Sequence, residues 1–248
     1  MNEQFSLVGQ RALVTGANSG IGQAIAVCMA SAGATVVCAG RSPMGETLAR
    51  IKENGAVACA LELDLSDPLA AASKVSEQDP LDILVNNAGI IRRADAIDFD
   101  ESDWDSVMDV NLKALFFVSQ AFARSVFDRQ GYGRVINIAS LLSFQGGIRT
   151  ASYTASKSAV AGLTKLFANE WGHKGINTNA IAPGYIKTKN TAALQLDKGR
   201  NKAILERIPA GRWGKPDDIG GAAVFLASRA ADYVNGAILN VDGGWLAR

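Results

Sequence analysis

A glycine-rich turn separates the first strand-like run of the chain from its first helical pattern. The run covers residues 12–15, the glycines Gly16, Gly20 and Gly22 follow at Gly-x-x-x-Gly-x-Gly spacing, and the helix is expected from residue 21. Glycines permit a tight turn and a close approach of backbone to a pyrophosphate. The N-terminus of the next helix adds free N–H groups and a positive dipole end. This order therefore predicts a dinucleotide site.

Short apolar runs alternate with longer helical patterns along the whole chain. The runs are rich in Val and Ile and mostly apolar throughout, as in parallel strands covered on both faces. The alternation predicts an α/β fold, a single Rossmann-type doubly wound domain whose seven-stranded parallel sheet has helices on both faces. The expected strands are 12–15, 35–39, 57–63, 83–86, 134–139, 177–181 and 238–241, and the expected helices are 21–32, 45–54, 68–78, 101–128, 153–173 and 217–228.

The composition suits one domain. The 248 residues are 48% hydrophobic and 20% charged, and no linker divides them, so residues 1–248 are expected to form a single dinucleotide-binding and catalytic domain. One long polar stretch interrupts the alternation. Loops of this length in a compact domain are usually lids or disordered inserts. We therefore expect residues 184–215 to be a substrate lid, with short helices possible within 191–207.

Charge and cysteine content bound the partners and the compartment. The net charge of +1 carries no basic stripe, which makes nucleic acid and anionic membranes unexpected partners. The N-terminus lacks the pattern of a signal peptide, and no apolar run approaches membrane-spanning length. Cys28, Cys38 and Cys59 form no C-x-x-C pair and lie in apolar stretches. They predict three reduced, buried thiols in a cytoplasmic protein.

A tyrosine and a lysine at helical spacing carry the chemistry. Tyr153 and Lys157 lie four residues apart, so they share one face of the expected helix. A positive charge beside a phenol favours the phenolate and is expected to lower the pKa of Tyr153. Such a phenol can exchange a proton with an alcohol or carbonyl oxygen, to which Ser140 could donate a second hydrogen bond. Alone, the pair could equally be a solvated Tyr and Lys on a helix surface.

Further motifs at the expected strand ends make the chain resemble the short-chain dehydrogenase/reductase family over essentially its full length. They are Asp64-Leu65, residues 86–89 (Asn-Asn-Ala-Gly) and Pro183-Gly184, together with Asn111 inside the fourth helix. The resemblance implies the catalytic roles of four residues. Tyr153 is the general acid/base, Lys157 lowers its pKa and binds the nicotinamide ribose, Ser140 orients the reacting oxygen, and Asn111 holds a water in a proton relay to Lys157.

The resemblance also implies where a nicotinamide dinucleotide binds. No metal is expected in this chemistry, and the single histidine, His173, lies at a helix end without a ligand cluster. The cofactor-binding residues implied are Gly16, Asn18, Ser19, Gly20, Ile21, Gly22, Asp64, Leu65, Asn87, Ala88, Gly89, Tyr153, Lys157, Pro183, Gly184, Ile186 and Thr188.

The residues after the second strand favour one nicotinamide cofactor. Arg41 and Ser42 stand where an acidic residue would accept the ribose hydroxyls of NAD and repel a 2′-phosphate. Both can donate hydrogen bonds to a phosphate, the arginine with its charge. We expect NADP to be preferred, with NAD possible. In the alternative, Arg41 stacks on the adenine and NAD is still used.

Five stretches are similar to the sugar-acid branch of the family: residues 86–95, 143–149, 182–185, 207–214 and the C-terminal segment 232–248. This similarity implies 2-deoxy-D-gluconate or 2-dehydro-3-deoxy-D-gluconate as the substrate. An arginine fork suits the carboxylate of such a molecule. In the alternative, these arginines pair with Asp95, Asp98 or a neighbouring subunit. The substrate residues expected are Ser140, Gln145, Arg149, Arg92 and Arg93, with Arg149 first because its loop joins Ser140 to Tyr153; Asn190 could also contact the polyol.

Two other functions stay open at this point. One is a ketoreductase acting on a 3-oxoacyl-carrier-protein thioester, which would share the catalytic residues. The other is a nucleotide-binding module without turnover. The family resemblance also implies a homotetramer built from the fourth and fifth helices and the C-terminal strand region. Those helices carry many apolar residues, which could equally all face the sheet: Leu115, Phe116, Phe117, Phe122, Leu163 and Phe167.

Overall fold

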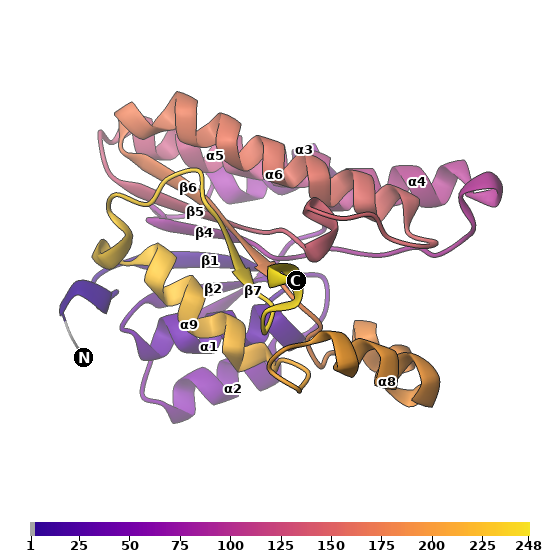
Figure 1. The fold of residues 1–248 in the computed structure, drawn as a ribbon. Coiled ribbons are helices and arrows are strands. Elements are labelled where there is room, and N and C mark those ends of the chain that lie inside the picture. The colour runs from indigo at the N-terminus through magenta and orange to yellow at the C-terminus, as the bar shows by residue number, and fades with distance from the viewer. Residues whose placement is uncertain (1–2) are drawn as a thin grey trace.

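The seven strands of the sheet all run in one direction. The computed structural model describes residues 3–248, and its sheet lies between two layers of helices (Figure 1). The strand order is β3-β2-β1-β4-β5-β6-β7, and every neighbouring pair is parallel. The predicted α/β fold is confirmed. The strands are β1 (Arg11–Thr15), β2 (Thr35–Gly40), β3 (Ala58–Glu62), β4 (Ile83–Asn86), β5 (Gly133–Ile138), β6 (Ile176–Pro183) and β7 (Ile238–Val241).

Helices cover both faces, as the alternation of patterns predicts. One face carries α3 (Pro68–Ser76), α4 (Glu101–Met108), α5 (Ala114–Asp128) and α6 (Ala151–Trp171). The other carries α1 (Gly20–Ser31), α2 (Gly45–Glu53) and α9 (Pro216–Ala227). Each helix range agrees with its expected range to within two residues at the ends, except for the single helix expected over 101–128.

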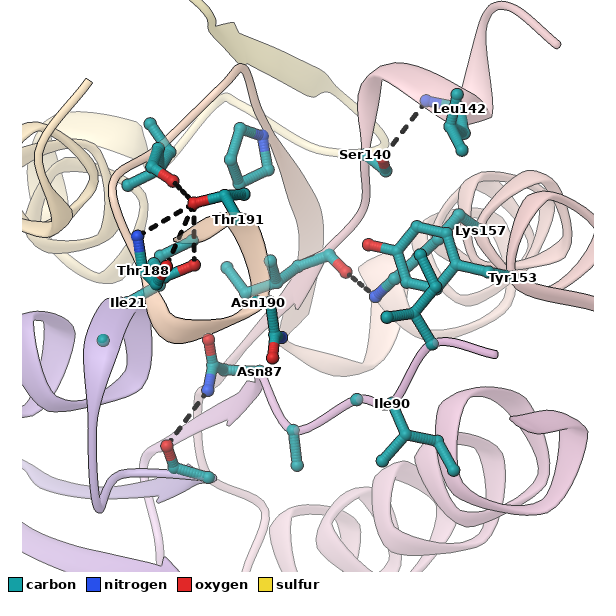
Figure 2. Close-up of a pocket in the computed structure, with 18 of the residues that line it drawn as sticks. Ile21, Asn87, Ile90, Ser140, Leu142, Tyr153, Lys157, Thr188, Asn190 and Thr191 are labelled. Carbon is teal, nitrogen blue, oxygen red and sulfur yellow. Dashed lines mark hydrogen bonds between the residues drawn. The ribbon is translucent and has the colours of Figure 1, made fainter. Parts of the chain in front are cut away.

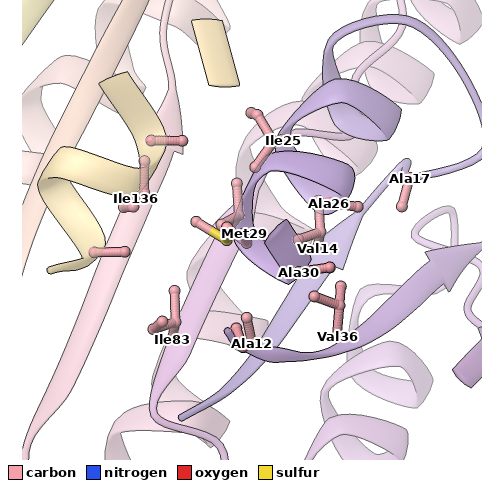
Figure 3. Packing of buried hydrophobic residues seen from close by; sticks show 14 of the residues in the cluster. Ala12, Val14, Ala17, Ile25, Ala26, Met29, Ala30, Val36, Ile83 and Ile136 are labelled. Atoms are coloured by element: carbon pink, nitrogen blue, oxygen red, sulfur yellow. The ribbon is translucent and has the colours of Figure 1, made fainter. Parts of the chain in front are cut away.

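The larger hydrophobic core lies between the sheet and α1. Ile25 and Met29 of this helix are fully buried and face Val14 of β1 and Ile83 of β4 (Figure 3). Burying such side chains contributes roughly 1.5–3 kcal/mol each to stability. A second core, with Phe122 at its centre, packs α3 and α5 on the opposite face. The two cores hold the strands rigidly, so the positions of the strand ends are fixed.

The region expected as one long helix contains a π-helical turn. Residues Asp109–Lys113 form this turn between α4 and α5, and Asn111 lies in its middle. A π turn holds one residue more than an α turn, and such turns are frequent at functional sites. Helix propensity and hydrophobic spacing do not distinguish this turn from regular α-helix. The sequence therefore predicts one continuous helix over residues 101–128, where the structure has α4, the π turn and α5.

The edge strand β3 departs from the expectation of strands covered on both faces. Its residues are exposed or partly exposed, and it lies at the edge of the sheet. The prediction of three buried thiols is therefore wrong for Cys59, which lies in this strand and is exposed. Cys28 is partly buried and Cys38 is buried. An edge strand has one neighbour, so its apolar residues cannot all be covered.

The long polar stretch after β6 folds into helices. It contains α7 (Ala192–Leu196) and α8 (Lys198–Arg207), so the short helices considered for residues 191–207 are present. A separate apolar cluster ties this segment to the body of the protein, with Trp213 buried among Leu141, Ile204, Ile208 and Trp245.

Across residues 3–248, the structure has no helix with the length and apolar character needed to cross a membrane.

Two adjacent glycines of α9 test the packing of the helix layer. An added Cβ on Gly220 would lie 2.3 Å from Sγ of Cys28 on α1, whereas Gly221 has open space. We expect Gly220→Ala to lower the free energy of unfolding by about 1–3 kcal/mol through overpacking. Gly221→Ala is the matched control and should raise it by up to about 1 kcal/mol through helix propensity. Urea unfolding of both variants measures this. Equal stability of the two would contradict the α1–α9 packing.

Candidate active site

A cavity of about 770 Å³ opens at the carboxyl ends of the strands. Its walls come from the turn between β1 and α1, the ends of β2, β4 and β5, the start of α6 and the segment after β6. The chain reverses its winding between β1 and β4, and ligands of open α/β sheets bind at such a switch point. All of the expected catalytic and cofactor-binding residues line it except Asn111.

The glycine-rich turn has the shape that a phosphate group needs. Gly16 and Gly20 have φ values of 67° and 59°, which favour glycine. A Cβ on Gly22 would lie 2.3 Å from the carbonyl oxygen of Gly16, so this helix start requires glycine. Ser19 precedes α1 but makes no capping hydrogen bond. The first N–H groups of α1 are therefore left for another acceptor, and a pyrophosphate fits there.

Asn87 and Thr15 hold this turn against the end of β4 (Figure 2). The amide of Asn87 donates to the carbonyl oxygens of Thr15 at 2.8 Å and Gly16 at 3.4 Å. The buried hydroxyl of Thr15 accepts from the backbone N–H of Asn87 and of Ala88, both at 3.0 Å. These bonds place Ala88 and Gly89 at the cavity wall. Thr15 was not among the predicted site residues, and its role depends on contacts between distant strands.

Arg41 and Asp64 lie side by side in the cavity, after the carboxyl ends of β2 and β3. The Nε atom of Arg41 is 3.9 Å from Oδ1 of Asp64, and both side chains are more than half exposed. The pKa of Asp64 is lowered, mainly by a hydrogen bond from the backbone N–H of Ser66 and less by the charge of Arg41. Ser42 also lines the cavity here. Because Asp64 balances only part of its charge, Arg41 can still attract a phosphate.

Ser140, Tyr153 and Lys157 meet on one wall of the cavity (Figure 2). Ser140 follows β5, and its hydroxyl oxygen accepts from the N–H of Leu142 at 3.1 Å, so its own proton can be donated to Tyr153 or to a ligand oxygen. The Nζ atom of Lys157 lies 5.7 Å from the centre of the Tyr153 ring. The helical spacing thus places the phenol and the ammonium on one face of α6, as expected.

Lys157 is a buried cation with one neutral partner. Only 4% of the residue is exposed, and Nζ donates to the carbonyl oxygen of Ile138 at 2.6 Å. Burial disfavours the charged form and lowers the pKa of Lys157 to about 8. A Cβ on Gly89 would lie 3.8 Å from this Nζ and 3.2 Å from Oδ1 of Asn111, so the two side chains flank Gly89.

The expectation that the pKa of Tyr153 lies below its ordinary value is wrong for this structure. Burial raises the pKa of Tyr153, while a hydrogen bond from Ser140 and the charge of Arg93 act in the opposite direction. Desolvation of the phenolate outweighs both. Further positive charge is needed in the cavity to form the phenolate near neutral pH.

Asn111 is fixed by the π-helical turn. Its Oδ1 accepts from the N–H of Ile90 at 2.8 Å, and its Nδ2 donates to the carbonyl oxygen of Ile90 at 2.9 Å. A third contact joins Nδ2 to the hydroxyl of Ser156 at 3.3 Å. Asn111 is 1% exposed and lies behind Ile90, which itself lines the cavity. The turn therefore aims this side chain at the wall beside Lys157.

The segment after β6 forms the opposite wall. Pro183, Gly184, Ile186 and Thr188 all line the cavity. The hydroxyl of Thr191 donates to the carbonyl oxygen of Ile186 at 2.7 Å and accepts from the N–H of Thr188 at 3.0 Å (Figure 2). This network gives the segment a fixed shape where it leaves the sheet.

The structure separates the three arginines expected near the substrate. Arg93 and Arg149 line the cavity, but Arg92 does not; it pairs with Asp103 at 2.9 Å. Arg149 has a φ of 61° and pairs with Asp95 at 3.2 Å, which is the alternative that the sequence left open. Gln145 and Asn190 line the cavity as expected.

Several cavity residues were not predicted. They come from the segment after β6 and from the C-terminus, where no sequence pattern indicates which side chains turn toward the sheet. Within residues 3–248, no group of three or more His, Cys, Asp or Glu side chains could hold a metal ion. In these two segments, the residues missed are Tyr185, Lys189, Thr191, Leu194, Arg200, Arg207 and Trp245.

Known proteins match the chain over its whole length. A family model described as Enoyl-(Acyl carrier protein) reductase matches residues 16–246. The 2-dehydro-3-deoxy-D-gluconate 5-dehydrogenase of Bacillus subtilis (strain 168) is 56% identical over 252 residues, which cover 100% of this chain and 99% of that protein.

Two solved structures share the fold closely. A candidate 2-deoxy-D-gluconate 3-dehydrogenase from Agrobacterium tumefaciens, with bound NADP, is 67% identical, covers 100% of both chains and has a TM-score of 0.97. A candidate NAD(P)-dependent gluconate 5-dehydrogenase from Beutenbergia cavernae, with NADP at low occupancy, is 48% identical, with a TM-score of 0.95; the match covers 99% of this chain and 100% of that one.

The burial of the Lys157 ammonium predicts how the free energy of unfolding changes with pH. Its pKa in the folded protein, about 8, lies below the ordinary value of 10.5. Below pH 8 the fold must keep a charge buried, so Lys157→Met should raise the free energy of unfolding at pH 7 by about 1–3 kcal/mol. Between pH 8 and 10.5 the unfolded chain binds more protons, so the wild type gains stability as pH rises and the difference shrinks.

Urea unfolding from pH 7 to 10 measures this difference. The matched control is Lys165→Met, an exposed lysine on the same helix, which should leave the pH dependence unchanged. A constant difference between wild type and Lys157→Met across this range would contradict the burial of a charged Lys157.

Proposed function

The chain belongs to the short-chain dehydrogenase/reductase family of NAD(P)-dependent oxidoreductases, and on that premise we propose that it acts on a sugar acid. The reaction transfers a hydride between the nicotinamide and a carbon bearing a secondary alcohol or ketone. The substrate proposed is 2-deoxy-D-gluconate or 2-dehydro-3-deoxy-D-gluconate. The Tyr153–Lys157 pair beside Ser140, in a cavity rich in cations, is the observation that carries this proposal.

The chain's own residues handle the proton. When bound, the oxidised nicotinamide supplies the hydride acceptor and a positive charge. Ser140 donates a hydrogen bond to the reacting oxygen, and Tyr153 as phenolate accepts the proton of the alcohol as the carbonyl forms. The charge of Arg93 stabilises the phenolate, and protonated Lys157, whose Nζ lies 5.7 Å from the centre of the phenol ring, is proposed to do the same. Asn111, beside Lys157 at Gly89, positions a water through which the proton returns to solvent.

The charge of the cavity supports an anionic substrate. Within residues 3–248, Asp64 is the one acidic side chain that lines it. Cations concentrated in a concave site raise the local concentration of anions. Part of this charge suits the cofactor's phosphates, and the remainder suits a carboxylate. The seven basic lining residues are Arg41, Arg93, Arg149, Lys157, Lys189, Arg200 and Arg207.

The names of two relatives support a sugar acid as the substrate, in preference to an acyl-carrier thioester. The Bacillus subtilis protein, 56% identical, and the Agrobacterium tumefaciens protein, 67% identical, are both named for deoxygluconates. Gln145 and Arg93 are proposed to contact the hydroxyl groups near the reacting carbon. Arg149 is proposed to act at the entrance, where Asp95 already shares its charge. Arg92 is not retained, because it lies outside the cavity.

Residues 184–215 are proposed to act as the lid. This segment lines the cavity through Tyr185, Arg200 and Arg207, and its far end is anchored by the buried Trp213. Closure would exclude water from the reacting carbon. Trp213 also holds α8, because it packs on Ile204 and its indole N–H donates to Oδ1 of Asn201 at 2.7 Å.

We also propose a homotetramer in the cytoplasm. Leu115, Phe122 and Phe167 are buried inside the protomer, so a subunit interface on α5 and α6 would use the partly buried Phe116, Phe117 and Leu163 and the exposed Leu166. Sedimentation velocity measures the assembly.

The unpaired state of the three cysteines agrees with a reducing compartment.

A substrate screen tests the proposed function. Purified protein is assayed with gluconate, 2-deoxy-D-gluconate, 2-dehydro-3-deoxy-D-gluconate and an acetoacetyl thioester, each with NADP(H) and NAD(H). We expect the deoxygluconates to give the largest kcat/KM. A larger value for the thioester would contradict the proposal.

Tyr153 is expected to be essential for proton transfer. Tyr153→Phe should lower kcat by about 10²–10⁴-fold, the usual contribution of a general acid/base, with a small change in the Kd of NADPH. Steady-state kinetics and fluorescence titration measure the two quantities. Tyr132→Phe, an exposed tyrosine, is the control. Full activity of Tyr153→Phe would contradict the mechanism.

Arg41 is expected to set the preference for NADP. Arg41→Met removes a charge-assisted hydrogen bond to the 2′-phosphate, worth about 1.5–3 kcal/mol, so kcat/KM for NADP should fall about 10- to 100-fold while that for NAD changes little. The exposed Lys52→Met is the control. If wild-type enzyme strongly prefers NAD, the cofactor proposal is wrong.

A further inference from the structure

The arginines around the cavity differ in what neutralises them. Arg41 lies near Asp64 and Arg149 pairs with Asp95. Within residues 3–248, Arg93, Arg200 and Arg207 have no acidic partner within ion-pair distance, although all three line the cavity. An unpaired guanidinium in a cavity attracts an anionic ligand more strongly than one already shared with a carboxylate.

Arg207 has a defined position without an acidic partner. It is the last residue of α8, and its guanidinium lies 3.9 Å from the ring centre of Trp245. Trp245 is only 4% exposed, and its indole N–H donates to Oε1 of Gln145 at 3.3 Å. Contact with an aromatic face holds a guanidinium while its N–H groups stay free for a carboxylate. The stack therefore orders Arg207 before any ligand binds.

Tyr185 and Arg200 complete the group. The Tyr185 ring lies 4.7 Å from that of Trp245 and 5.4 Å from that of Trp213. Tyr185, Arg200 and Arg207 line the same cavity, and burial raises the pKa of Tyr185 while the charges of Arg207 and Arg200 act in the opposite direction. A neutral phenol beside two cations can donate to the same anion that they attract.

This group lies next to the catalytic wall. Trp245 packs in one apolar cluster with Leu141, the residue after Ser140. Gln145, which receives the Trp245 indole hydrogen bond, belongs to the turn that follows, and its N–H donates to the carbonyl oxygen of Leu141 at 3.1 Å. An anion bound at Arg207 would therefore be within the same cavity as the reacting oxygen, on the side of the lid.

We propose that Arg207, held by Trp245 and assisted by Arg200 and Tyr185, binds the carboxylate of the substrate. This proposal rests on the proposed sugar-acid function and names the residues that recognise the acid group. Because Arg207 and Arg200 belong to α8 and already line the cavity, a bound carboxylate holds this part of the proposed lid against it. Binding energy from this end of the substrate, remote from the reacting carbon, then orients the alcohol at Tyr153 and Ser140.

The test compares an acid with its neutral counterpart. D-gluconate and D-glucitol have the same chain length and differ in the carboxylate. Their Kd values are measured on the enzyme–NADPH complex, in which an alcohol cannot be oxidised, and kcat/KM is measured for oxidation with NADP. The variants are Arg207→Met, Arg207→Lys and Arg149→Met, and Arg229→Met, 80% exposed beside Asp232, is the control.

Arg207→Met should weaken gluconate binding and lower its kcat/KM by about 10- to 100-fold, as expected for the loss of a charge-assisted contact, with glucitol and NADPH unchanged. Arg207→Lys should recover only part of the loss, because lysine lacks the planar fork. Arg229→Met should match the wild type.

Four results would overturn the proposal. If Arg207→Met leaves gluconate unchanged while the wild type oxidises sugar acids, the carboxylate is bound elsewhere and the proposed function stands. An equal loss for gluconate and glucitol would show a structural role, and a selective loss in Arg149→Met alone would assign the acid to the entrance. A wild type that neither prefers gluconate over glucitol nor oxidises any sugar acid refutes the proposed function as well.

Discussion

The parallel direction of all seven strands is the constraint on which the site depends. Because the strands share one direction, every carboxyl end opens on the same edge of the sheet, and the reversal between β1 and β4 leaves a crevice there. The glycine turn, Asn87, Ser140 and the segment after Pro183 all follow strand ends. Residues far apart in the chain therefore meet in one cavity, while the two hydrophobic cores hold the strand ends in place.

Proton transfer at this edge of the sheet depends on Lys157, whose ammonium group is buried at a cost in stability. A backbone carbonyl is its hydrogen-bond acceptor. Burial also raises the pKa of Tyr153, so desolvation shifts both groups toward their neutral forms, although Lys157 keeps its charge below about pH 8. A cofactor with a positive nicotinamide ring would shift this balance toward the phenolate. The acid/base function is in this sense tied to cofactor binding, and the cationic cavity extends the same electrostatics to an acidic substrate.

The sequence predicted those parts of the structure that depend on neighbouring residues in the chain. Strand and helix positions follow from hydrophobic period, and the turn at Gly16 follows from glycine spacing. The π-helical turn around Asn111 was missed because its extra residue leaves propensity and hydrophobic spacing almost unchanged. The exposure of Cys59 depends on which strand lies at the edge of the sheet, which sequence order alone does not determine. The raised pKa of Tyr153 depends on burial, and the place of Arg207 depends on how α8 folds back over Trp245.

A structure of the enzyme with NADP and gluconate tests the central claim most directly, since it locates both ends of the substrate at once. We expect a hydroxyl group within hydrogen-bond distance of Tyr153 and Ser140, and the carboxylate on the guanidinium of Arg207 where it lies over Trp245. A carboxylate bound to Arg149 at the entrance, or a sugar chain that does not reach Tyr153, would contradict it.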